Sequence, residues 1–177
     1  VYNQNCGGNN VRIYDTRHRT VAVSEAIQWR KSAARGDGMG TIYLSDIEPL
    51  IVTQTFDVLH YDRSVSNGVL TLNNKQYEKG LGTHAYSEII YELNGRFVGF
   101  SSDVGLDDSQ DGTPGSVVFK VYVDGSLRWT SPVMRWDSTT ENVHIDITRA
   151  QNLKLVVEDA GDGDRCDHAN WADAKLF

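Results

Sequence analysis

The closing stretch DAGDGDRCDHANWADAKLF (159–177) crowds aspartates, a cysteine, a histidine, an asparagine and a tryptophan together. Such side chains could bind a metal ion, catalyse a reaction or line a ligand site. An EF-hand loop requires glycine at its sixth position, where a register that starts at Asp162 places Asp167. Cys166 and His168 supply two soft ligands, which are too few for a closed tetrahedral zinc site. This stretch alone therefore gives weak support for a metal site.

A second polar loop, DVGLDDSQDGTPGS (103–116), resembles a calcium-binding segment. Oxygen-bearing side chains alternate from Asp107 to Asp111 and are followed by Gly112, as in the first half of an EF-hand loop. The twelfth position is Val118, where that loop requires a bidentate glutamate. An EF-hand is excluded, and two interpretations remain open: a calcium site of another kind, or a solvated acidic loop.

Catalysis has no clear signature in the sequence. Glycoside hydrolases use two carboxyl groups of unequal pKa, but acids are common throughout this acidic chain and no pair can be assigned without geometry. The GxSxG motif of a nucleophile elbow is absent, and neither Cys6 nor Cys166 has a recognisable catalytic-cysteine setting.

Carbohydrate binding fits the available side chains better than catalysis does. Sugars are recognised by planar hydrogen-bonding groups matched to their hydroxyls and by an aromatic ring against the apolar face of the pyranose. The candidate residues of these types are Glu78, His84, Asp167, Asn170 and Trp171. Trp171 has an equally good alternative role as a core residue, because it lies beside the last predicted strand.

Composition and charge narrow the class of protein and of partner. The chain has 177 residues, 40% of them hydrophobic and 23% charged, as expected for one globular domain with an extension. A net charge of -7 and a pI of about 5.1 argue against nucleic acid as a partner. No apolar run is long enough to span a bilayer, and VYNQNCGGNN lacks the features of a signal peptide.

Short alternating segments dominate from Thr41 onward and predict strands that would position these residues. VVFKVYV (117–123) places apolar side chains on one face and is followed by Asp124-Gly125, a strong hairpin signal. SEIIYEL ends at another turn, Asn94-Gly95. Alternation recurs in NVHIDI and LKLVV, and further strands are expected in TIYLSDI, GVLTL and WADAKLF. Seven or more such strands predict an all-β fold, an antiparallel β-sandwich.

Residues 1–40 differ from the rest and are predicted to form an N-terminal extension or linker, with 41–177 as the sandwich domain. Ser24 is a possible N-cap and Gly36 a stop signal for one short helix. The two cysteines lie near opposite ends of the chain, and the sequence leaves open whether they pair in a disulfide.

Four motifs in order give the chain a specific resemblance over residues 41–177. KGLGTHA, VGLDD, DAGDG and DHANWADA resemble the NPCBM-type carbohydrate-binding modules, which are family 51 of the carbohydrate-binding modules. The resemblance implies a jelly-roll-like β-sandwich without catalysis, attached to a secreted bacterial glycoside hydrolase. It implies binding of galactose-containing glycans, with terminal galactose or GalNAc as in blood-group A and B antigens.

The resemblance also implies roles for individual residues. His84 and Asn170-Trp171 are the leading sugar contacts, with Glu78 as a carboxylate acceptor. Calcium is expected as a structural cofactor, and the candidate ligands are Asp46 with Asp173, or alternatively Asp107 with Asp108. The family more usually has an acid where this chain has Asn170, which could change the preferred sugar substituent.

We therefore expect a monomeric, secreted binding module that tethers a covalently linked catalytic domain near galactose-bearing glycans, with no nucleic-acid or membrane partner. Two alternatives stay open from the sequence. One is a small glycoside hydrolase, and the other is a calcium-dependent adhesion domain that binds protein.

Overall fold

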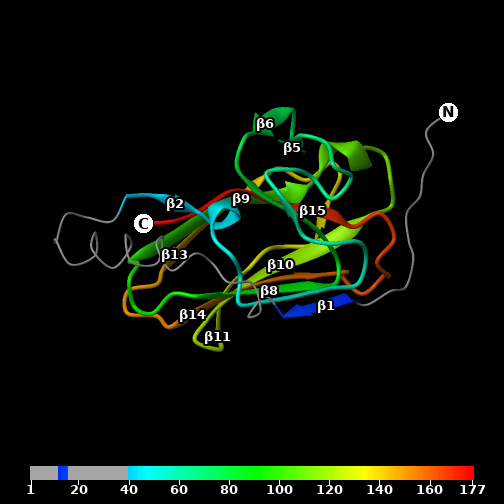
Figure 1. Cartoon of the computed structure of the whole chain (residues 1–177). Helices are drawn as coiled ribbons and strands as arrows, with labels where there is room; N and C mark the ends of the chain where they lie inside the picture. The colour runs from blue at the N-terminus through cyan, green and yellow to red at the C-terminus, as the bar shows by residue number, and fades with distance from the viewer. Residues whose placement is uncertain (1–11, 16–39) are drawn as a thin grey trace.

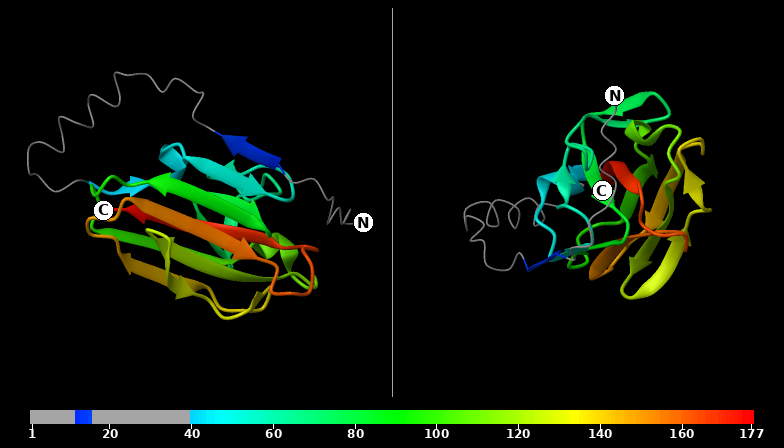
Figure 2. Two further views of the ribbon diagram at one scale, coloured as in Figure 1. Left: turned by 90° about the horizontal axis from the view of Figure 1, so that it is seen from below. Right: turned by 90° about the vertical axis from the view of Figure 1, so that its right-hand side faces the viewer.

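The structure, a computed structural model, describes residues 12–15 and 40–177. These residues form two antiparallel sheets that pack face to face (Figure 1). The first sheet has seven strands in the order β1-β3-β8-β14-β10-β11, and β12 also pairs with β10. Figure 2 (left) shows this order from the dark blue β1 to the yellow β11. The strands are β1 (Arg12–Asp15), β3 (Ile51–Gln54), β8 (Ser87–Glu92), β14 (Asn152–Glu158), β10 (Ser116–Val123), β11 (Ser126–Thr130) and β12 (Met134–Arg135).

The second sheet has six strands in the order β13-β9-β15-β7-β4, and β2 also pairs with β15. Its strands are β13 (Glu141–Asp146), β9 (Gly99–Leu106), β15 (His168–Leu176), β7 (Gly80–His84), β4 (His60–Tyr61) and β2 (Ile42–Tyr43). A separate hairpin is made of β5 (Leu70–Leu72) and β6 (Lys75–Tyr77), and the described helical turns are the 3-10 segments η2 (Leu44–Asp46) and η3 (Asp108–Gln110). The predicted all-β sandwich is confirmed.

The core lies between the sheets and follows the alternation read from the sequence. On β10 the side chains of Val117, Phe119 and Val121 are fully buried, while the intervening Val118 and Lys120 are half-buried on the outer face. The same alternation holds on β13 and β14, whose inward residues are Val143, Ile145, Leu153, Leu155 and Val157. Period-two patterning is reliable on these strands because each of them buries mainly one face.

The two predicted turns are present but connect different things. Asp124-Gly125 joins the paired strands β10 and β11, and both residues have positive φ, as a tight hairpin turn requires. Asn94-Gly95 also has positive φ at both residues, but it joins β8 and β9, which belong to opposite sheets. The turn chemistry was therefore readable from the sequence, whereas the partner of each strand was not.

The N-terminal segment contributes a strand to the sandwich. β1 pairs antiparallel with β3, from Arg12 opposite Gln54 to Asp15 opposite Ile51. The helix predicted between Ser24 and Gly36 lies outside the described residues, and the division into 1–40 and 41–177 stays a prediction. No described helix has the length and apolar character needed to cross a membrane.

The β5-β6 hairpin covers the outer face of the second sheet and forms a small separate core there. Leu70, Leu72 and Tyr77 pack against Ala172 of β15. The chain that leads to the hairpin crosses the sheet at Gly82, where an added Cβ would lie 2.2 Å from the Arg63 carbonyl oxygen. Only a glycine permits this close approach, so the second sheet is buried on both faces at this point.

Candidate functional site

The loop end of the sandwich, made of residues 85–86, 107–115, 135–138 and 159–167, brings several predicted sugar contacts together. On the paired strands β7 and β15, His84 lies opposite His168, and Asn170 lies opposite Gly82. Because side chains alternate along a strand, Trp171 points into the inter-sheet core while its neighbours point to the outer face. The pairing of β7 with β15 therefore brings His84, His168 and Asn170 together, although they are far apart in sequence.

The two imidazoles present complementary hydrogen-bonding nitrogens. His84 Nδ1 lies 2.6 Å from the Ala85 carbonyl oxygen and must donate to it, which leaves Nε2 as an acceptor. His168 Nδ1 lies 3.0 Å from Gln110 Nε2 and 2.8 Å from Ser66 Oγ. Since the Gln110 amide donates, His168 carries its proton on Nε2. Neither Nε2 has a protein partner.

Burial keeps both rings neutral. His84 is fully buried and His168 is 6% exposed, and their ring centroids are 5.3 Å apart. Burial lowers the pKa of His84, and burial together with the neighbouring His84 lowers the pKa of His168 to about 4. The Phe56 ring, 4.7 Å from that of His84, adds to the apolar surroundings.

Asn170 is a buried structural link rather than an exposed ligand group in this structure. Its Nδ2 donates to Asp107 Oδ2 at 2.7 Å, and the Asp107 carboxylate also accepts from the backbone N–H groups of Thr71 and Ser109. An acid at position 170 would face the buried Asp107 carboxylate. The amide therefore suits this neighbour, because it donates where a second carboxylate would repel.

Asp167 is the most strongly perturbed carboxyl group of the loop end. It is fully buried, its Oδ1 accepts from the Ser116 N–H at 2.8 Å, and its Oδ2 has no protein partner. Burial, followed by the negative charges of Asp162, Asp159 and Asp164, raises its pKa to about 8. The aspartates of the closing stretch thus favour a protonated Asp167 at neutral pH.

This raised pKa predicts that the protein loses stability as the pH rises from 6.5 to 8. The folded state holds a proton that the unfolded state, with a pKa of 3.8, releases. The resulting stabilisation is complete below pH 3.8 and is lost as the pH rises to about 8. The lowered pKa values of His84 and His168 act oppositely, mainly as the pH falls below 6.5, and they offset part of the Asp167 effect just above it. Between pH 6.5 and 8 we expect a net fall of about 1 kcal/mol in the free energy of unfolding.

Urea unfolding at several pH values in the presence of EDTA measures this fall. The matched variant is Asp167→Asn, which keeps an oxygen acceptor for the Ser116 N–H but does not titrate. The variant should show no decrease between pH 6.5 and 8. An equal decrease in both proteins would contradict the assignment to Asp167.

The remaining predicted sugar contacts lie elsewhere. Trp171 is fully buried and packs edge-on against Phe119 with ring centroids 5.0 Å apart, so its ring belongs to the core. Glu78 is exposed but precedes β7, whereas His84 ends that strand. The structure therefore unites His84, Asp167 and Asn170 at the loop end and separates Glu78 from them.

The carboxylates predicted as calcium ligands do not gather into one site. Lys79 Nζ contacts Asp46 at 2.5 Å, and Asp173 pairs with its neighbour Lys175 at 2.6 Å. Asp107 accepts from the Asn170 amide and two backbone N–H groups, and Asp108 accepts from two backbone N–H groups of the β5-β6 turn. No group of three or more His, Cys, Asp or Glu side chains within 12–15 and 40–177 is placed to hold a metal ion.

Cys166 is buried and disulfide-bonded, and its backbone has a positive φ of 67°. It anchors the end of the acidic loop directly before β15. Cys6 lies outside the described residues.

Comparison with known proteins places this arrangement in a family. The NPCBM/NEW2 domain matches residues 40–177. The carbohydrate-binding module CBM51 of the Clostridium perfringens GH95 protein, solved in complex with methyl-galactose, is 36% identical with a TM-score of 0.75; the match covers 78% of this chain and 100% of that chain. The chain belongs to the NPCBM/NEW2 family, family 51 of the carbohydrate-binding modules. It is therefore a non-catalytic binding module, and the predicted resemblance is confirmed.

Other NPCBM/NEW2 relatives occur within much longer proteins. The second CBM51 module of Clostridium perfringens ZmpB, solved with GlcNAc, is 38% identical with a TM-score of 0.74, over 77% of this chain and 31% of that chain. Alpha-1,3-galactosidase B of Akkermansia muciniphila is 34% identical over 70% of this chain. A putative endo-alpha-N-acetylgalactosaminidase of Renibacterium salmoninarum is 34% identical over 61% of it. The module spans 16% and 7% of the lengths of these two curated relatives.

Sequence reasoning missed two residues that the structure brings to the loop end. His168 was considered only as a zinc ligand, although its register opposite His84 makes it part of the same cluster. Trp136, in the turn after β12, is 43% exposed and was not singled out. Its surroundings, Arg-Trp-Asp-Ser, are polar, which is the available sequence signal for an exposed aromatic ring.

Proposed function

We propose that this module binds glycans with terminal galactose or GalNAc, including those of the blood-group A and B type, through its loop end. The observation that carries the proposal is the methyl-galactose complex of the Clostridium perfringens module, which this chain matches along that module's entire length. The loop end adds the required chemistry, because it joins half-exposed carboxylate and guanidinium groups to exposed aromatic rings.

The module would hold a covalently linked glycoside hydrolase close to such glycans, outside the bacterial cell. A single shallow site binds modestly, because each sugar hydroxyl must first give up its hydration. Tethering compensates for this, since the linked enzyme meets its substrate at high effective concentration. The two curated relatives, whose names describe enzymes acting on galactosyl and N-acetylgalactosaminyl linkages, support this proposal.

Calorimetric titration with methyl-galactoside, GalNAc and GlcNAc, preceded by a glycan array, tests the proposal. Binding to galactose or GalNAc without release of free sugar is the expected result. Glucose, which differs from galactose at the 4-hydroxyl, is the matched control ligand. Tighter binding of GlcNAc than of galactose and GalNAc would contradict the proposed sugar specificity. An array without any binding would contradict the proposed function as a whole.

The family resemblance alone supports structural calcium. The four predicted carboxylate ligands do not gather into one site among the described residues. The experiment is thermal unfolding in excess calcium and in EDTA. A structural ion should raise the unfolding temperature, since a ligand that binds only the folded state stabilises it. Equal unfolding temperatures would contradict a structural calcium ion.

A further inference from the structure

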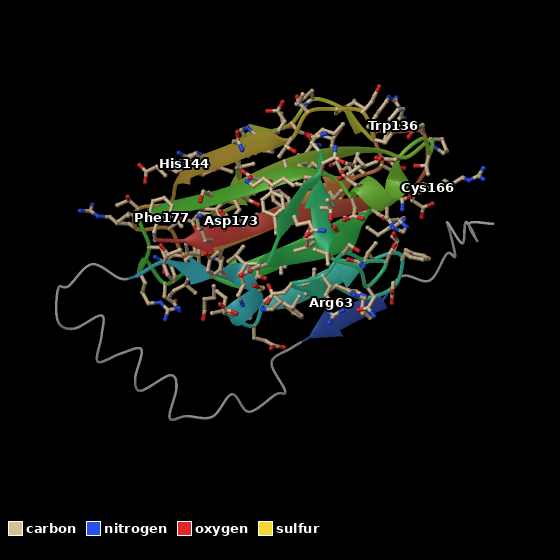
Figure 3. All side chains as sticks on the ribbon, turned by 90° about the horizontal axis from the view of Figure 1, so that it is seen from above. Arg63, Trp136, His144, Cys166, Asp173 and Phe177 are labelled. Carbon is tan, nitrogen blue, oxygen red and sulfur yellow. The ribbon has the colours of Figure 1, made fainter. Side chains whose placement is uncertain are left out.

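We propose that Trp136 is the aromatic wall of the sugar site, with Arg135 and Asp162 as its polar partners. This inference rests on the proposed function and names the side chains that perform it. A sugar-binding site of this kind needs an exposed ring, and Trp171 cannot supply one because it is fully buried. Figure 3 shows Trp136 at the same end of the sandwich as Cys166, with His144 and Phe177 at the opposite end.

The turn that carries Trp136 is held rigidly by hydrogen bonds on either side of the ring. Within the turn, the Arg135 N–H donates to Ser138 Oγ at 2.8 Å, and the Ser138 N–H donates to the Arg135 carbonyl oxygen at 3.0 Å. From outside, Asn73 Nδ2 donates to the Ser138 carbonyl oxygen at 3.1 Å, and Asn73 Oδ1 accepts from Thr140 N and Oγ1, each at 2.6 Å. An exposed ring on a fixed backbone loses little conformational entropy when a ligand stacks on it.

The β5-β6 turn, which contacts the Trp136 turn through Asn73, is itself held by hydrogen bonds. Asp108 accepts from the Asn73 and Asn74 N–H groups at 2.8 and 2.7 Å, which fixes the β5-β6 turn that in turn holds the Trp136 loop. Hydrogen bonds from residues far apart in sequence thus fix the backbone beside one half-exposed tryptophan.

A donor and an acceptor flank the turn. Arg135 Nη1 lies 3.8 Å from Asp162 Oδ2, and the two side chains are 51% and 50% exposed. Ser116 Oγ lies 2.7 and 2.8 Å from the two Asp162 carboxylate oxygens and orients them. The remaining guanidinium N–H groups can donate to one sugar hydroxyl while the carboxylate accepts from its neighbour.

The ligand class that fits is a single neutral pyranose with vicinal hydroxyls. Its C–H face would stack on the Trp136 ring, and two adjacent hydroxyls would bind Arg135 and Asp162. Tyr86 is also exposed at this end and its hydroxyl donates to the Glu88 carboxylate, whereas Trp136 directly follows Arg135 of the Arg135–Asp162 pair. The geometry therefore favours Trp136 over Tyr86.

The test is calorimetric titration of Trp136→Ala with methyl-galactoside and GalNAc. We expect the affinity to fall by about 10-fold or more, because stacking contributes most of the apolar contact of a small ligand. Tyr61→Ala is the matched control, since Tyr61 is 40% exposed on β4 and should leave the affinity unchanged. Asp162→Asn should also weaken binding, by about 5- to 10-fold, because one acceptor is lost.

Fluorescence separates a direct contact from an indirect effect. Sugar should change the tryptophan emission of the wild-type protein, and Trp136→Phe should retain measurable binding while losing that change. Wild-type affinity in Trp136→Ala, or an unaltered emission change in Trp136→Phe, would overturn this inference but leave the proposed function standing. If the wild-type protein binds neither sugar, the proposed function itself fails.

Discussion

Replacement of Trp171 with alanine is expected to lower the free energy of unfolding by about 3–5 kcal/mol. The indole is fully buried between the sheets, where it packs edge-on against Phe119 at 5.0 Å and lies 6.5 Å from Phe100. Deleting it leaves a large cavity that the rigid strands β9, β10 and β15 cannot close. Urea unfolding monitored by circular dichroism measures the loss.

The matched control is Trp136→Ala, the same substitution at a half-exposed tryptophan. This variant should change stability by less than about 0.5 kcal/mol, because its ring is not part of the core. The two variants therefore separate two roles of one residue type. A Trp171→Ala protein as stable as Trp136→Ala would contradict the core assignment.

Replacement of Asp107 with alanine is expected to lower the free energy of unfolding by about 3 kcal/mol, because this buried carboxylate accepts hydrogen bonds from three donors. These donors are Asn170 Nδ2 at 2.7 Å, the Ser109 N–H at 3.1 Å and the Thr71 N–H at 3.3 Å. Asp107 itself is 2% exposed, so water cannot readily replace it. The Asn170 amide is buried, and a buried donor left without an acceptor costs about 1–3 kcal/mol, while the two partly buried backbone donors add less.

Asp111→Ala is the control, since Asp111 is exposed in the same loop and should change stability little. Unfolding of both variants is compared in calcium and in EDTA. If Asp107 acts through hydrogen bonds, its destabilisation is the same in the two buffers. A loss confined to the calcium buffer would instead assign Asp107 to a metal site.

The strands were predictable because alternation is a local property. On β10 and β14 the residues at every second position are apolar and are all buried towards the core, so the sequence already shows which side faces inward. Strand pairing was not predictable by the same route. The Asn94-Gly95 turn is followed by a change of sheet, because β8 pairs with β3 and β14 while β9 pairs with β13 and β15.

The candidate site was predictable in its general location but not in its exposed surface. His84 and Asn170 do lie on neighbouring strands, but both are buried. Asn170 lies opposite Gly82, where the chain crosses the sheet, and the Phe56 ring packs on His84. This burial comes from segments that are distant in sequence, which no local pattern near residues 84 or 170 predicts. The sequence predicts Trp171 as a sugar contact, but the structure buries Trp171 in the core and leaves Trp136 exposed.

The sequence by itself determined that this chain is an antiparallel β-sandwich of the NPCBM/NEW2 family, because strand periodicity and four ordered motifs are properties of neighbouring residues. The tertiary structure alone decided which polar and aromatic groups remain available to a ligand. Exposure depends on what distant segments cover: Ser66 and Gln110 close over His168, whereas Asn73 and Ser138 hold the turn beside which Trp136 stays open to solvent.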